Sequence, residues 1–138
     1  MKLFPLKRHI KSKEGVTHFK RYLLFPFGKY GNLYLHIIYQ PDKDEHLHNH
    51  PWNYVQIPIY GKYIEKLEGD EYHLVKPLQM NKRNGLKIFH KIEKLLSKKV
   101  ITLFFVGKRY NDNWGYNVDG EFVDNRTYRF NKNINNSK

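Results

Sequence analysis

The sequence predicts an all-β domain, built as an antiparallel sandwich or barrel. Aromatic residues make up 16% of the 138 residues, and aromatic and β-branched side chains favour strands. They occur in short runs punctuated by glycine and proline turn signals. No long amphipathic helical pattern stands out. Several short strands at such spacing are typical of sandwiches and barrels, and the length fits one domain.

The first half of the chain supplies the earliest strands. Residues 16–25 (VTHFKRYLLF) form a β-branched and aromatic run. Residues 32–39 (NLYLHIIY) are almost continuously apolar, which suits a strand covered on both faces. Between residues 52 and 77, Gly61 and the Gly69-Asp70 pair separate three further β-like runs. The spacing predicts tight hairpins.

Residues 87–99 fit two patterns equally well. Helical periodicity groups Ile88, Ile92 and Leu95 on one face, whereas Ile88, His90 and Ile92 also alternate as in a strand. Periodicity alone does not separate helix from strand over so short a run.

The second half contains the clearest strand, residues 100–106 (VITLFFV), and a favoured hairpin turn at Asp119-Gly120. Residues 131–138 are polar and have little to bury, so they are predicted to form a disordered tail. The expected organisation is a basic N-terminal segment over residues 1–15, a β-barrel over residues 16–130, and that tail.

Composition limits the functions to consider. There are 25 Lys and Arg against 13 Asp and Glu, a formal charge of +12, but the lysines are scattered and no recognition motif accompanies them. Specific nucleic-acid binding is therefore not expected. The chain has no cysteine, so any metal must rest on nitrogen and oxygen ligands. No signal peptide or membrane-spanning run is recognisable, and a cytoplasmic protein is expected.

A histidine cluster carries the strongest chemical signal. Side chains two positions apart on a strand project to one face, so His48 and His50 can converge on a metal ion. Imidazole is the commonest protein ligand for such ions, and His90 is the best third ligand because it alternates with inward apolar residues. The alternative is a solvated, tag-like polar loop. Pro51-Trp52 lead directly into a β segment, which favours a buried site.

Other side chains near the cluster leave alternatives open. His46 is a candidate fourth ligand or proton shuttle at the mouth of the barrel, although an exposed loop histidine is the preferred interpretation. Tyr54 and Gln56 share the inward parity of the histidines. Glu65 alternates inward with Gly61, which would make it a general base, but an exposed glutamate between lysines is favoured.

The spacing around the cluster resembles the first motif of the cupin superfamily. His48-Asn49-His50 is followed by three residues, Tyr54 at the position of the motif glutamate, six residues and Gly61. Asn84-Gly85 and His90 match the second motif loosely. The HxHxHPW string at 46–52, ITLFFVGKR at 101–109 and Trp114-Gly115 look like a family of small bacterial and phage cupin-like proteins. The resemblance covers residues 16–125.

This resemblance implies a double-stranded β-helix, the jelly-roll barrel of cupins, and a mononuclear metal site. Iron, zinc, nickel and manganese are all compatible with it. The expected function is a non-haem metalloenzyme of the dioxygenase type acting on a small, anionic substrate. Tyr54 and Gln56 would act in catalysis, and Trp52, Tyr54 and Arg109 would bind the substrate. The alternative is a non-catalytic or isomerase-type cupin that binds a small molecule such as a sugar. A homodimer is considered as well.

Overall fold

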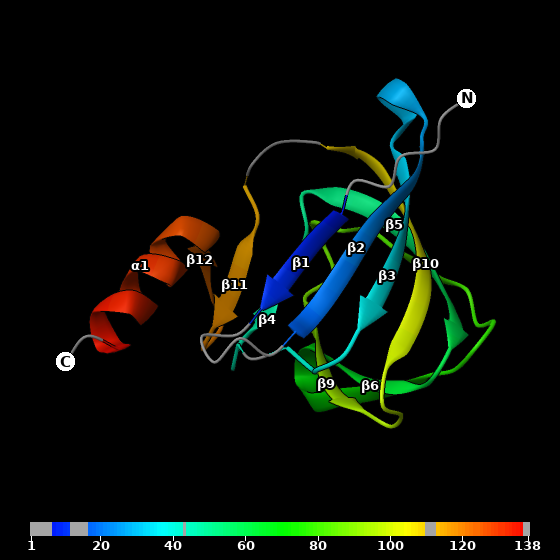
Figure 1. Cartoon of the computed structure of the whole chain (residues 1–138). Helices are drawn as coiled ribbons and strands as arrows, with labels where there is room; N and C mark the ends of the chain where they lie inside the picture. The colour runs from blue at the N-terminus through cyan, green and yellow to red at the C-terminus, as the bar shows by residue number, and fades with distance from the viewer. Residues whose placement is uncertain (1–6, 12–16, 43, 110–112, 137–138) are drawn as a thin grey trace.

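The computed structural model describes residues 7–11, 17–42, 44–109 and 113–136 of the chain. The expected all-β class is confirmed, because strands dominate these residues (Figure 1). The strands are β1 (Lys7–Lys11), β2 (Thr17–Pro26), β3 (Asn32–Ile38), β4 (Leu47–His48), β5 (Trp52–Tyr60), β6 (Tyr63–Leu67), β7 (Glu71–Val75), β8 (Asn81–Arg83), β9 (His90–Leu95), β10 (Val100–Arg109), β11 (Gly115–Val118) and β12 (Glu121–Asp124). Two 3-10 turns, η1 (Gly28–Tyr30) and η2 (Glu68–Asp70), and one helix, α1 (Asn125–Asn136), complete the set.

The strands form two six-stranded antiparallel sheets. The first has the order β1-β2-β3-β10-β5-β8, and the second has the order β12-β11-β4-β9-β6-β7. Neighbours in each sheet are mostly distant in sequence, so the chain crosses repeatedly between the two sheets, as in a jelly roll. In Figure 1 the sheets wrap around a common interior, while α1 lies outside the barrel beside β11 and β12.

Alternation along β10 shows why the sequence folds in this way. Its burial alternates residue by residue, and Val100, Thr102, Phe104 and Val106 are the buried members. The strand pairs with β3 on one side and with β5 on the other, which makes it central to its sheet. Strand interiors of this kind favour β-branched and aromatic side chains, so the prediction for residues 100–106 is confirmed.

Two apolar clusters fill the interior. One combines buried residues of four strands, namely Ile38, Tyr63, Val75 and Val100. The other contains Tyr54, Phe104 and Val106, with Tyr34 and Trp52 packed against it. Both sheets contribute to the first cluster, which therefore joins them.

The ambiguous segment over residues 87–99 is resolved as a strand. β9 covers His90–Leu95 and is hydrogen-bonded on both sides, to β6 and at His90 to β4. β9 pairs with β6 over most of its length, with β4 at His90, and with Asp42 through the backbone of Ile92. Tertiary pairing thus decides between two patterns that periodicity left equal. The hairpin predicted at Asp119-Gly120 is present between β11 and β12, with φ values of 52° and 88° at the two turn residues.

The C-terminal prediction is wrong for the part of the tail that the structure describes. Residues 131–136, expected to be disordered, belong to α1. Asp124 caps this helix, since its Oδ1 accepts a hydrogen bond from the Arg126 N–H at 2.8 Å. Tyr128 also stacks on Tyr116 of β11, with ring centroids 3.8 Å apart. These contacts with the barrel stabilise a helix that its polar composition does not signal. Residues 137 and 138 lie outside the described residues.

The described ranges contain no helix with both the length and the apolar character needed to cross a membrane.

Much of the predicted N-terminal segment, residues 1–6 and 12–15, lies outside the described ranges. Residues 7–11 of that segment form β1 and pair with β2.

A close approach of two backbones near the start of β5 yields a first prediction. Gly85 is buried, its carbonyl accepts the His50 N–H at 2.9 Å, and its N–H donates to Asn53 at 3.1 Å. A Cβ at this position would overlap the Trp52 carbonyl group. Gly85→Ala should therefore lower the free energy of unfolding by about 1–3 kcal/mol, measured by urea denaturation.

Gly107→Ala provides the matched control for that experiment. A Cβ at Gly107 would have the Asn53 carbonyl oxygen at 3.3 Å as its nearest neighbour, so the loss should be clearly smaller. Equal losses for the two variants would contradict the proposed crowding at Gly85.

Candidate metal centre

The backbone around the HxHxHPW string is fixed from two sides by Asn49. Its Nδ2 donates to the Leu86 carbonyl at 3.0 Å, and its Oδ1 accepts the Gly115 N–H at 2.8 Å. Its own N–H donates to the Gly115 carbonyl at 3.1 Å. Asn49 is 4% exposed, so these bonds satisfy a buried amide and set the path of the chain between His48 and His50.

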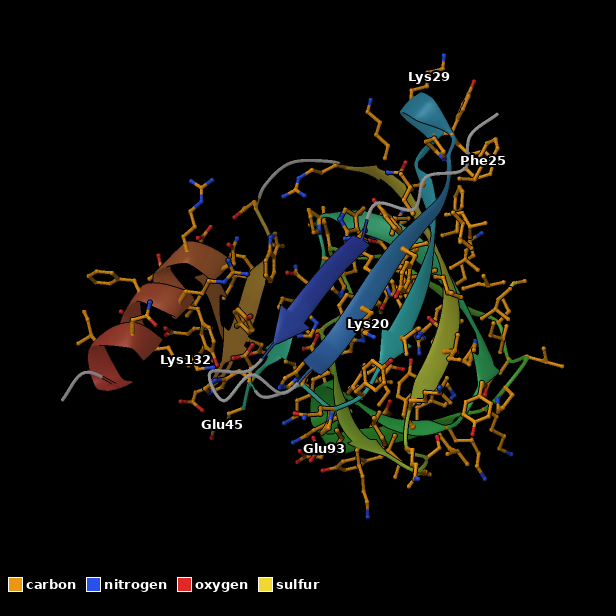
Figure 2. The ribbon with its side chains drawn as sticks, viewed as in Figure 1. Lys20, Phe25, Lys29, Glu45, Glu93 and Lys132 are labelled. Carbon is orange, nitrogen blue, oxygen red and sulfur yellow. The ribbon has the colours of Figure 1, made fainter. Side chains whose placement is uncertain are left out.

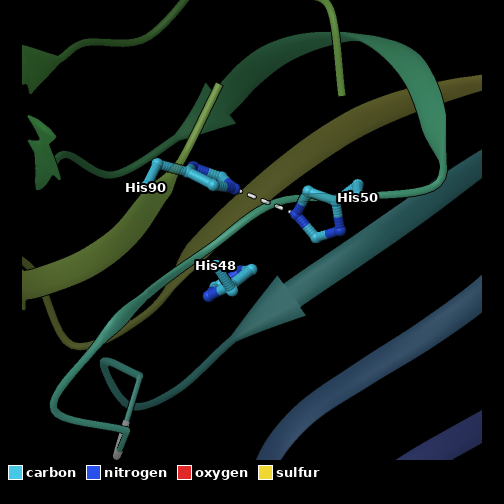
Figure 3. A group of neighbouring side chains, drawn as sticks. All are labelled: His48, His50 and His90. Carbon is cyan, nitrogen blue, oxygen red and sulfur yellow. Dashed lines mark hydrogen bonds between the residues drawn. The ribbon is translucent and has the colours of Figure 1, made fainter. Parts of the chain in front are cut away.

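The three predicted metal ligands come together. His48 ends β4, directly opposite His90 of β9, and His50 lies in the connection that leads to β5. One ring nitrogen from each histidine lies within 4.8 Å of the other two. His50 Nε2 and His90 Nε2 are 2.9 Å apart (Figure 3). Two neighbouring histidines and a third from forty residues later in the chain thus converge on one point.

The electrostatic environment favours neutral imidazoles. Burial is the main cause that lowers the pKa of His48 to about 4, and the charge of His90 adds to it. Burial, followed by His48 and His90, also holds the pKa of His50 well below its usual range. Neutral imidazole is the form that binds a metal ion, so His48 and His50 are ready for coordination at neutral pH.

The cluster also fits an ion in its dimensions. Imidazole nitrogens bound to zinc at about 2.0–2.1 Å lie about 3.0–3.4 Å from one another. The His50 and His90 nitrogens are already at nearly this separation, and the third is close enough to join them. In the part of the chain described by the structure, the cluster contains histidines alone and no carboxylate.

Tyr54 occupies the position that a carboxylate would take in the motif, and it lies beside the cluster. The Tyr54 side chain is 3% exposed, and its hydroxyl is 3.4 Å from His90 Nε2. Burial and the nearby Glu65 raise the pKa of Tyr54 well above its usual range, so the phenol keeps its proton. A protonated hydroxyl within reach of the cluster can donate a hydrogen bond.

Trp52 forms one wall of the site. Its ring stacks on the imidazole of His50, with centroids 4.5 Å apart and planes 12° apart. It also packs against Phe104 of β10. The sequence placed Trp52 at the site, and the structure brings it into direct contact with a candidate ligand.

The remaining predicted site residues lie at the margins. Gln56 is buried, and its Oε1 accepts the Tyr63 hydroxyl at 2.7 Å. Arg109 is the exposed last residue of β10, where it pairs with Trp52 of β5. Paired residues share a face of the sheet, so Arg109 lies at the end of the barrel that holds Trp52.

His46 is not part of the three-histidine cluster, and its role as a fourth ligand stays a prediction. Its Nδ1 lies 3.1 Å from the Tyr128 hydroxyl of α1. The same side of the barrel holds Asp44, which accepts Tyr116 Oη–H at 3.1 Å and the Lys132 ammonium at 2.7 Å. Lys132 therefore links α1 to the loop between β3 and β4, beside Glu45 (Figure 2). His46 thus contacts α1 in this structure.

Glu65 corrects an interpretation made from the sequence, since it is 3% exposed rather than a surface residue. Its Oε1 accepts His90 Nδ1–H at 2.7 Å, and its Oε2 accepts a guanidinium N–H of Arg83 at 3.1 Å. Burial would raise the pKa of Glu65, but the hydrogen bond and charge of His90, followed by those of Arg83, lower it to about 2. The alternation of Glu65 with Gly61 correctly indicated that its side chain points inward. Nothing in the sequence indicated a role for Arg83, which lies in a three-residue polar strand.

Comparison with solved structures identifies the class. A cupin-2 domain from Rhodospirillum rubrum superposes with a TM-score of 0.61 at 15% identity, over 91% of this chain and 80% of its own. FeII HppE superposes with a TM-score of 0.58 at 9% identity, over 73% of this chain and 56% of its own. AerE from Microcystis aeruginosa superposes with a TM-score of 0.56 at 20% identity, over 79% of this chain and 48% of its own. This chain therefore spans about half the length of HppE and AerE.

The protein thus has the cupin fold, with a three-histidine cluster at the position where the sequence predicted a metal site. No family model and no curated protein matches the sequence. The narrower likeness to small bacterial and phage cupin-like proteins stays a prediction.

Buried neutral histidines make the metal-free fold sensitive to acid. Burial, followed by the charge of Arg21, lowers the pKa of His36 from 6.5 to about 3. The unfolded chain then binds more protons than the folded one below pH 6.5, so stability is full above that value and falls as the pH drops toward 3. His36→Phe should reduce this loss by up to about 1.4 kcal/mol per pH unit. Urea unfolding of both proteins between about pH 7 and pH 4 measures the loss of stability. Equal losses in the wild type and in His36→Phe would contradict this prediction.

Proposed function

We propose that the protein is a mononuclear metalloenzyme in which His48, His50 and His90 hold one divalent ion. The observation that carries this proposal is the convergence of three imidazoles within 4.8 Å, from β4, the following connection and β9. When bound, the ion would supply Lewis acidity and open coordination positions for substrate and for dioxygen or water. Iron, zinc, nickel and manganese remain the candidate ions, because three imidazoles do not select among them.

The protein's own residues have distinct roles in this proposal. Tyr54, with its hydroxyl 3.4 Å from His90 Nε2, donates a hydrogen bond to a ligand bound at the centre. Trp52 shields one side of His50 through its stacked indole. Gln56 orients the substrate, and Arg109 at the end of β10 attracts its charged group. Together these residues would bind a small molecule and exclude water from one side of the centre.

An anionic substrate is the class that the charges favour. Three neutral imidazoles leave the double positive charge of the ion uncompensated by any direct ligand. Arg21 adds positive charge near the centre, since its charge is among the causes, after burial and the neighbouring histidines, that hold the pKa of His50 below its usual range. Substrates with a carboxylate, and especially those that bind through two atoms, should be preferred over neutral ones.

The alternative function is a non-catalytic or isomerase-type cupin that binds a sugar or a similar small molecule. It is favoured by a pocket of about 350 Å³ at the β6–β7 side of the barrel, lined by Leu67, Glu71, Tyr72, His73 and Arg83. This lining mixes hydrogen-bond donors, acceptors and apolar surface, as a polyhydroxylated ligand requires.

Metal content distinguishes the two functions. The purified protein should retain about one divalent ion per chain, and His48→Ala, His50→Ala or His90→Ala should abolish it, because two imidazoles bind such an ion far less tightly than three. Elemental analysis gives the measurement. His46→Ala is the control and should keep the ion, since His46 contacts Tyr128. Protein that stays metal-free after incubation with each candidate ion would favour the alternative function.

Substitution of Tyr54 tests its role separately. Tyr54→Phe should leave metal content unchanged and weaken substrate binding or turnover by about 10–100-fold, because only one donated hydrogen bond is lost. Tyr54→Glu should tighten metal binding by adding a fourth ligand. Calorimetric titration of the metal, together with assays of candidate carboxylate substrates, makes both measurements. Loss of metal in Tyr54→Phe would instead show that the residue supports the centre.

A further inference from the structure

Glu65 joins the metal centre to the interior wall of the barrel. It lies on β6, 3% exposed, and its two carboxylate oxygens are used by different partners. Oε1 accepts His90 Nδ1–H at 2.7 Å, and Oε2 accepts the Arg83 N–H at 3.1 Å. His73 Nδ1 lies 3.6 Å from Oε2. The carboxylate is thus held on both sides and has little freedom to turn.

The short contact with His90 determines which of its ring nitrogens carries the proton. An ionised carboxylate only accepts hydrogen bonds, so the nitrogen 2.7 Å from it must be the donor. When His90 carries a single ring proton, that proton therefore lies on Nδ1 and the lone pair lies on Nε2. That nitrogen faces His50 Nε2 at 2.9 Å and is the one available to the ion.

We propose that Glu65, itself held by Arg83, is a positioning residue that fixes the tautomer and the ring orientation of His90 for metal binding. This inference rests on the proposed function and identifies the residues that prepare its site. The position that a carboxylate ligand would occupy holds Tyr54. In this protein the carboxylate of Glu65 acts indirectly, by its hydrogen bond to the imidazole of His90.

The sheet geometry supports an indirect role. β6 and β9 are neighbours in one sheet, with Glu65 opposite Ile92, while Arg83 lies opposite Tyr54 in the other sheet. The Arg83–Glu65–His90 chain of hydrogen bonds therefore crosses the barrel interior from sheet to sheet. Both oxygens of Glu65 are occupied within this chain, and Glu65 is not among the residues whose ligand atoms cluster.

Metal affinity is the first test. Zinc binding is measured by competition with a chromophoric chelator for the wild type, Glu65→Gln and Glu65→Ala. Loss of such a partner weakens metal binding by about 10–100-fold, with alanine at the upper end because glutamine can still accept one hydrogen bond. Glu68→Gln, an exposed change in the adjoining η2 turn, is the matched control and should bind as tightly as the wild type.

A double-mutant cycle separates positioning from a general structural effect. If Glu65 acts through His90, then Glu65→Gln should have no further effect on the weak residual zinc affinity of the His48–His50 pair in a His90→Ala background, measured at raised zinc concentration. Additive losses in affinity would overturn the proposal, and so would variants of Glu65 that bind zinc within about twofold of the wild type.

The metal-free protein gives an independent measurement. Imidazole ¹⁵N chemical shifts should show His90 protonated at Nδ1 in the wild type, with this preference lost in Glu65→Ala. If the wild type binds no metal, the proposed function fails, but the tautomer measurement still decides the role of Glu65. An Nε2-protonated His90 in the wild type would overturn the inference.

One complication is that Glu65→Ala leaves the guanidinium of Arg83 without its carboxylate, which can prevent folding. The paired variant Glu65→Ala with Arg83→Met removes that unpaired cation. It should fold, and it should show the same loss of zinc affinity and of the His90 tautomer preference. Retention of both in the paired variant would overturn the proposal.

Discussion

The pairing of β4 with β9 at His48 and His90 is the constraint on which the site depends. β4 is only two residues long, so it has almost no ladder of its own to fix it. Its position comes from β11 on one side, from β9 on the other, and from the three hydrogen bonds of Asn49. Because these partners lie far apart in the sequence, the histidines converge only when both ends of the second sheet have formed.

The interior of the barrel around the three-histidine cluster contains buried polar side chains. Burying charged groups is costly unless they are paired and hydrogen-bonded. Glu65 meets that condition through Arg83 and His90, and Gln56 meets it through Tyr63. The apolar clusters around Val100 and Phe104 offset the cost from the neighbouring layers of the barrel. A polar centre between apolar layers can thus be maintained without weakening the sheets that frame it.

The sequence was sufficient for the strand-rich class, for most strands and for the three histidines, because these depend on local alternation. It was insufficient where a distant partner decides the outcome. Residues 87–99 became a strand through β4 and β6, and the C-terminal residues became helical through Tyr116 and Asp124. Glu65 had the right parity but lies between two lysines, so only its burial reveals it. Arg83 had no signal, because a three-residue polar strand is indistinguishable from a loop.

The stacking of Trp52 on His50 gives this molecule an optical probe of its own centre. The chain has two tryptophans, and the other, Trp114, lies beside Tyr116 with Arg129 over its ring. Of these two tryptophans, both among the described residues, Trp52 is the one in ring contact with a candidate ligand, with centroids 4.5 Å apart. A change of charge at that imidazole alters the field felt by the indole, and with it the intrinsic fluorescence. Events at the centre can therefore be followed in unlabelled protein, with Trp114 as an internal reference.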